Sequence, residues 1–135
     1  MADDRIREVQ RLVAALAKVG TTIGGAMAGV ADEEMTGNAP VLVLFSLDLD
    51  GPQRPTALQE ITGLSSGGLT RLVERLETAG LVTRRSGALA EDRRAVLVAL
   101  TPRGRRTARA MAAAGAASIE EHRDLMTDLA GYLDP

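Results

Sequence analysis

Arginines stand in pairs on either side of a short predicted turn, Arg84 and Arg85 before it and Arg93 and Arg94 after it. A guanidinium group keeps its positive charge at physiological pH and matches phosphate oxygens with a planar fork of N–H donors. Four such charges in one hairpin repel each other unless an anion compensates them. Arginine at a loop tip can also enter a narrow minor groove of DNA, where the electrostatic potential is most negative. The arginines therefore indicate a surface that binds nucleic acid.

The segment that carries these arginines is predicted to be a β-hairpin. Residues 82–85 form the first strand and residues 95–100 the return strand, in which apolar residues alternate so that they share one face. Residues 86–92 form the tip. Asp92 is placed to orient an arginine of the tip, although an exposed Asp92–Arg94 pair could also serve only to stabilise the hairpin, by about 0–1 kcal/mol.

Other polar residues that could contact DNA lie on a helix predicted from Ser65 to Ala79. Ser65 caps this helix, Gly80 ends it, and an apolar stripe at positions 69, 72, 73 and 76 leaves the opposite face polar. A helix with this pattern fits the major groove and reads base edges with its N-terminal half. A solvated surface face is the alternative interpretation, and the neighbouring arginine hairpin favours DNA. The candidate contacts on this helix are Ser65, Ser66, Gly68, Thr70, Arg71 and Arg75.

The charge of the chain is distributed unevenly. The formal net charge of the 135 residues is −2, which is unusual for a protein that binds DNA. Residues 56–109, however, contain ten arginines and five acidic residues, so this segment carries +5 and the rest of the chain −7. A basic centre between acidic ends fits a nucleic-acid surface that is held by helices without their own contact to DNA.

Composition argues against several other functions. The chain has no cysteine and one histidine, which disfavours a disulfide scaffold, a zinc site, a thiol switch and a catalytic Ser–His–Asp set. We therefore expect no enzyme activity, no metal and no cofactor. With one Phe, one Tyr and no Trp, the chain offers few rings for stacking on single-stranded nucleic acid, so double-stranded DNA is the expected partner. The sequence has no apolar run of about 18 residues that would span a membrane, and its charged N-terminus differs from a secretory signal, so the expected location is the cytoplasm.

Two shorter helices are predicted to precede the polar helix. The first spans about residues 38–47, with Asn38 as its cap, and is apolar nearly all round, which indicates a central position. Residues 48–55 are predicted to form a turn. Thr56 and Gln59 match a capping box that opens a second, short helix.

Long amphipathic helices are predicted at both ends of the chain. Residues 3–31 keep an apolar residue at every third or fourth position, although Gly24 and Gly25 weaken this helix by roughly 1 kcal/mol each relative to alanine. Another helix begins at Thr101 and Pro102, which suit a cap and a first helical turn. The first helix is longer than a small core needs, so a second subunit could bury its apolar stripe.

The central segment resembles the MarR family of bacterial transcription regulators. The resemblance covers about residues 38–110 and rests on the helix sequence LTRLVERLETAGLV, on the wing pair Asp92 and Arg94, and on the motif formed by Leu100, Thr101 and Gly104. It implies a mainly α fold with a small β-hairpin wing (α+β). Residues 1–135 would then form one domain, with a winged helix-turn-helix lobe at residues 38–104 and dimerisation helices at residues 3–31 and 105–133.

The resemblance also implies a function. A protein of this family is expected to be a sequence-specific, DNA-binding transcriptional regulator, here a homodimeric repressor of pseudo-palindromic operators in double-stranded DNA. Many relatives release DNA when a small anionic molecule binds, so an effector of this kind is a further expectation.

The chain departs from the family pattern at three places. Gly67 and Gly68 stand where larger polar residues are common, no cysteine is present for a thiol switch, and residues 132–135 stand where relatives turn into one more helix. Because a further helix would follow residues 132–135 in relatives, we expect part of the dimer interface to be missing or replaced. These departures leave two alternatives open: a winged-helix module for protein interaction or dimerisation with weak or lost DNA binding, and a ligand sensor whose role on DNA is secondary.

Overall fold

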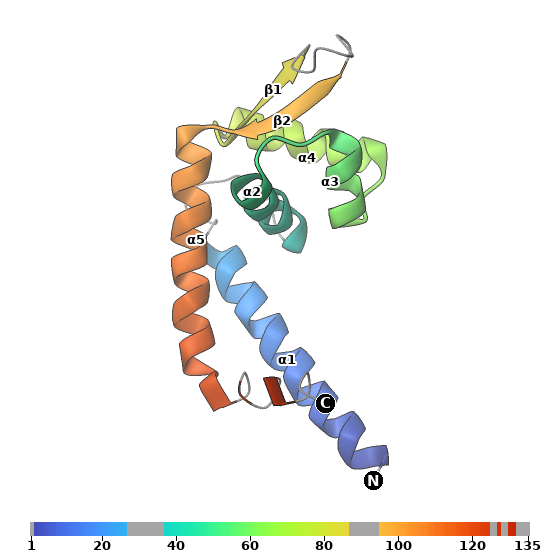
Figure 1. Cartoon of the computed structure of the whole chain (residues 1–135), viewed down its shortest axis with the longest axis vertical. Helices are drawn as coiled ribbons and strands as arrows, with labels where there is room; N and C mark the ends of the chain where they lie inside the picture. Colours follow the sequence, from blue (N-terminus) through green and yellow to red (C-terminus); the bar gives the residue numbers. More distant parts are fainter. Residues whose placement is uncertain (1, 27–36, 87–94, 125–126, 128–129, 132–135) are drawn as a thin grey trace.

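The computed structural model describes residues 2–26, 37–86, 95–124, 127 and 130–131. Within these residues the chain forms five helices and a two-stranded antiparallel hairpin, which confirms the predicted α+β class. Figure 1 shows the short helices and the hairpin at one end of the molecule, and two long helices that extend away from them. The elements are α1 (Ala2–Ala26), α2 (Asn38–Asp50), α3 (Pro55–Thr62), α4 (Ser66–Thr78), β1 (Val82–Ser86), β2 (Val96–Leu100) and α5 (Pro102–Glu121).

The hydrophobic core lies in the lobe that α2, α3, α4 and the hairpin form. Its largest side chains are leucines that are at most 1% exposed: Leu44, Leu58, Leu69, Leu76 and Leu81. Met111 of α5 is fully buried in the same cluster. The first half of α5 is therefore part of the lobe, while its second half continues beside α1 (Figure 1).

Gln53 connects the middle of β2 to helix α2. Its backbone N–H donates to the Val98 carbonyl of β2 at 3.0 Å, and the Val98 N–H donates back at 2.8 Å. Its side-chain Nε2 donates to the carbonyl and hydroxyl oxygens of Ser46 on α2, at 3.0 and 2.7 Å. The turn predicted over residues 48–55 is thus wrong in part, because α2 continues to Asp50 and Gln53 pairs with a strand.

Several helix ends are where local sequence signals predicted them. The Ser65 hydroxyl accepts the Gly68 N–H at 3.1 Å and caps α4, and Gly80 follows α4 with a φ of 76°. At the start of α5, the Thr101 hydroxyl accepts the Gly104 N–H at 2.9 Å and donates to the Gly80 carbonyl at 2.6 Å. Thr101 therefore caps one helix and holds the end of another.

Two predicted helix caps are wrong, because each helix begins earlier than expected. Asn38 is the first residue of α2, and Gly37 takes the cap position without a side-chain bond. The Thr56 capping box does not form, since α3 begins at Pro55 with Arg54 before it. Proline suits the first helical position because its φ is already helical and it has no N–H that needs a partner there.

α1 lies along α5 and buries one of its two apolar stripes. The buried stripe consists of Leu12, Ala15 and Val19, which are at most 8% exposed. The other stripe remains 46–57% exposed and consists of Ile6, Val9, Val13 and Leu16. The sequence predicted a single stripe for a second subunit, which also contained Leu12 and Val19, and only the exposed part of it remains available to a partner.

The described residues reach only part of the predicted ends of the two long helices. α1 passes through Gly24 and Gly25 and runs to Ala26, and residues 27–31 of the predicted helix lie outside the described residues. α5 ends at Glu121, before the predicted residue 133, and the described residues 123–124, 127 and 130–131 are again helical. Beyond it, residues 125–126, 128–129 and 132–135 are not among the described residues.

Candidate nucleic-acid interface

α3 and α4 form a helix-turn-helix whose second helix presents a polar face. The connection turns at Gly63, which has a φ of 72°, and the inner side of α4 is buried in the lobe core. The outer side carries the candidate DNA contacts. Gly68 is half-buried, and the exposed members of this set are Ser65, Ser66, Thr70, Arg71 and Arg75.

The two glycines at the start of α4 have different surroundings. A Cβ at Gly68 would lie 3.2 Å from the Ser65 Oγ, so a side chain there would crowd the hydroxyl that caps the helix. A Cβ at Gly67 would meet the Arg71 guanidinium at 3.9 Å, which is an ordinary contact. Gly68 therefore supports the start of α4, whereas packing does not require glycine at position 67.

The hydroxyl of Thr70 is already engaged with the helix backbone. Its Oγ1 donates to the Ser66 carbonyl at 2.8 Å. A hydroxyl that donates in this way can still accept a hydrogen bond. Thr70 can therefore accept from a base amino group or a ligand, but donation to a phosphate would require it to leave the backbone.

Arg84 of the hairpin is bound to the last turn of α4. Its Nη2 donates to Oε1 of Glu77 at 3.0 Å, and its backbone N–H donates to Oε2 of the same carboxylate at 3.3 Å. The hydrogen bond from the Arg84 side chain lowers the pKa of Glu77, and the same bond raises the pKa of Arg84. Glu77 could not be predicted from the sequence, because its pair with Arg84 joins two different elements and leaves no periodic signal.

The remaining candidate residues of the wing are only partly described. Arg85 is exposed and follows Arg84 on β1, so the two side chains point to opposite faces of the strand. Asp92, Arg93 and Arg94 lie outside the described residues. The structure therefore places Arg84 next to α4 and directs Arg85 away from it.

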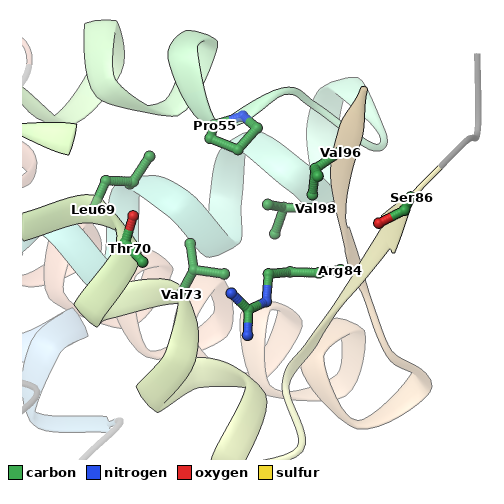
Figure 2. Close-up of a pocket in the computed structure, with 8 residues that line it drawn as sticks. All are labelled: Pro55, Leu69, Thr70, Val73, Arg84, Ser86, Val96 and Val98. Atoms are coloured by element: carbon green, nitrogen blue, oxygen red, sulfur yellow. The ribbon is translucent and has the colours of Figure 1, made fainter. Parts of the chain in front are cut away.

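A pocket of about 310 Å³ opens between α4, the start of α3 and the hairpin. Figure 2 shows the Arg84 side chain reaching from β1 toward Val73 of α4, with its guanidinium at the pocket wall. Arg84 is the charged residue of a lining that is otherwise apolar apart from two hydroxyls. The lining residues are Pro55, Leu69, Thr70, Val73, Arg84, Ser86, Val96 and Val98. Such a space suits a small molecule with an apolar body and an anionic group.

The described part of the chain contains no group of three or more His, Cys, Asp or Glu side chains that could hold a metal ion. None of its helices is both long and apolar enough to cross a membrane.

Comparisons with known proteins agree with this geometry. The model of the MarR family matches residues 35–95. No curated protein matches the chain in sequence. Among solved structures, AbsC, a MarR family transcriptional regulator from Streptomyces coelicolor, is 25% identical, with 100% of this chain and 93% of AbsC covered and a TM-score of 0.66.

Two further solved structures share the fold. A transcriptional regulator from Thermotoga maritima is 23% identical, with 96% of this chain and 89% of that chain covered and a TM-score of 0.67. Wild-type MarR from E. coli, in its apo form, is 20% identical, with 93% of this chain and 96% of that chain covered and a TM-score of 0.66.

Proposed function

We propose that this chain is a homodimeric repressor, because the model of the MarR family matches residues 35–95 and the chain shares its fold with transcriptional regulators of known structure. It binds pseudo-palindromic operators in double-stranded DNA and acts in the cytoplasm, without enzymatic chemistry. The observation that carries the proposal is the placement of the polar face of α4 beside a hairpin whose Arg84 is bound to that helix.

The two parts of this surface take different roles in the proposal. The N-terminal half of α4, with Ser65, Ser66, Gly68, Thr70 and Arg71, enters the major groove. Arginines bind phosphates along the flanks or enter the minor groove. This second group comprises Arg75, Arg84, Arg85, Arg93 and Arg94, with Asp92 as the residue that orients the wing.

We expect the protein to protect a site in the intergenic DNA upstream of its own coding sequence. Binding should weaken on the order of a thousandfold between about 50 and 200 mM salt, because a dimer with at least about six phosphate contacts releases that many counterions. Footprinting at low salt, followed by titration at increasing salt, measures both quantities. A folded dimer that protects no site at low salt would contradict the repressor proposal and favour a protein-interaction module.

A small anionic effector is proposed for the pocket between α4 and the hairpin. The supporting observation is a guanidinium, that of Arg84, at the wall of an apolar space of about 310 Å³. An aromatic carboxylate can place its ring among Val73, Val96 and Val98 and its charge at Arg84. A ligand held there would occupy the space between the two DNA-contacting parts.

Benzoate is expected to bind this pocket with a Kd on the order of 1 mM, as befits a ligand of this size, and to weaken operator binding. Benzyl alcohol, which has the same ring and no charge, should do neither. Val96→Phe narrows the pocket and changes no residue of α4, so it should abolish the effect of benzoate while the protein still binds DNA. Calorimetry and DNA titration measure the two effects, and equal responses to both ligands would refute an anion site.

A further inference from the structure

An acidic residue stands close to the proposed DNA-binding surface. Glu77 lies in the last turn of α4, the helix proposed to enter the major groove. A carboxylate near DNA repels the phosphates, so by charge alone its removal should strengthen binding. The residue is therefore expected to have another role that offsets this repulsion.

The contacts of Glu77 identify such a role. Both oxygens of its carboxylate accept hydrogen bonds from Arg84, one from the backbone N–H and one from the guanidinium, at 3.3 and 3.0 Å. The first contact fixes the strand and the second fixes the side chain. Among the described residues, Glu77 is the hydrogen-bond acceptor of the Arg84 guanidinium.

The position of this contact along β1 matters for the orientation of the hairpin. Leu81 and Val82 are buried at the base of the strand, whereas Arg84, Arg85 and Ser86 are exposed. The side chains of β1 itself thus pack in the core only at its base; farther out, β1 is held by its pairing with β2 and, at Arg84, by Glu77. On the other side of the hairpin, backbone hydrogen bonds to Gln53 hold β2.

We propose that Glu77 is a positioning residue of the DNA-binding surface, which holds β1 and the Arg84 guanidinium against α4 so that wing and helix reach DNA together. The proposal rests on the proposed DNA-binding function. Charge alone predicts that removal of the Glu77 carboxylate strengthens DNA binding, whereas the proposal predicts that it weakens DNA binding.

The test compares Glu77→Gln with Glu74→Gln, which removes the same charge one turn earlier on α4. Glu74 is exposed, and its influence on Arg84 is only that of a nearby charge. We expect Glu77→Gln to weaken operator binding about threefold, the scale of an exposed ion pair, and Glu74→Gln to leave it unchanged or tighten it about twofold by reduced repulsion. Fluorescence titration with operator DNA at low salt measures both.

Two further readouts separate positioning from general loss of stability. Hydroxyl-radical footprints of Glu77→Gln should lose protection at the wing flanks and keep it in the centre of each half-site. In a double-mutant cycle, Glu77→Gln should weaken binding less when Arg84 is already glutamine, because the pair is then already broken. Thermal unfolding of each variant shows whether it is folded during the titration.

Each outcome bears on one of the two proposals. If the wild-type protein binds DNA and Glu77→Gln binds equally well or more tightly, as Glu74→Gln does, the positioning role is refuted and DNA binding stands. A uniform loss of the footprint also refutes the positioning role. So does a double-mutant cycle in which the effects of Glu77→Gln and Arg84→Gln on DNA binding are additive. If the wild-type protein binds no DNA, the proposed function fails first.

Discussion

Replacing Gly104 by alanine is expected to destabilise the lobe by about 3 kcal/mol or more, because the new methyl group has no space. A Cβ at this position would lie 1.9 Å from the Leu81 carbonyl oxygen and 3.1 Å from Cδ2 of Leu100. The Leu81 backbone cannot easily move away. Its N–H donates to the Leu76 carbonyl at 2.9 Å, and its own carbonyl accepts the Thr101 N–H at 3.0 Å.

Thermal or urea unfolding measures this loss, and we expect the midpoint temperature to fall by about 10 °C or more. Gly67→Ala is the matched control, because its Cβ would be 3.9 Å from the nearest atom and alanine favours a helix by up to about 1 kcal/mol. This variant should be as stable as the wild type or more stable. A Gly104→Ala protein with an unchanged midpoint would mean that α5 and the Leu81 backbone before β1 are not in such close contact.

Leu16→Glu is expected to convert the proposed dimer into monomers and to lower operator affinity about 100-fold or more, since two linked half-site contacts become one. Leu16 belongs to the α1 stripe that is left 46–57% exposed. A carboxylate placed in an apolar interface would lose its hydration without gaining a partner. Light scattering at micromolar concentration should then report a mass near the 14.2 kDa of one chain.

The control for this experiment is Ala14→Glu. Ala14 is exposed, and the helical repeat places it on the side of α1 that carries neither apolar stripe. The same charge at this position should leave both the dimer mass and the operator affinity unchanged. If the wild-type protein is itself monomeric, or if Leu16→Glu remains a dimer, the α1 stripe is not the interface.

The parts of the fold that could be predicted from sequence depend on local chemistry. Ser65, Gly80 and Thr101 act within a few residues of their own positions, so their types and spacing were sufficient to define the ends of α4 and the start of α5. The errors at Asn38 and Thr56 have a local cause too. In each case two neighbouring residues could begin the helix, and the earlier one does so.

The parts that could not be predicted depend on contacts between distant residues. Gln53 binds both Ser46 and Val98, and a turn-like sequence gives no sign of a strand partner 45 positions away. In the sequence, Glu77 has the pattern of an ordinary solvated helix residue. Its pairing with Arg84 of β1 is visible only in the folded structure. The candidate DNA contacts on α4 were accessible to sequence analysis because an amphipathic helix separates its buried and exposed residues by a fixed period.

Helix α5 belongs both to the lobe and to the pair of long helices, and this has a consequence for the distance between the two lobes in the proposed dimer. One rigid helix of 20 residues holds Met111 in the lobe core and also packs against α1, and such a helix is about 30 Å long. A tilt of about 5° at one end therefore displaces the other end by about 2.6 Å over that length. This displacement approaches the rise of one base pair, about 3.4 Å. In the proposed dimer, a small change in the angle between α1 and α5 is thus enough to move both α4 helices out of register with their half-sites, while every contact inside each lobe is preserved.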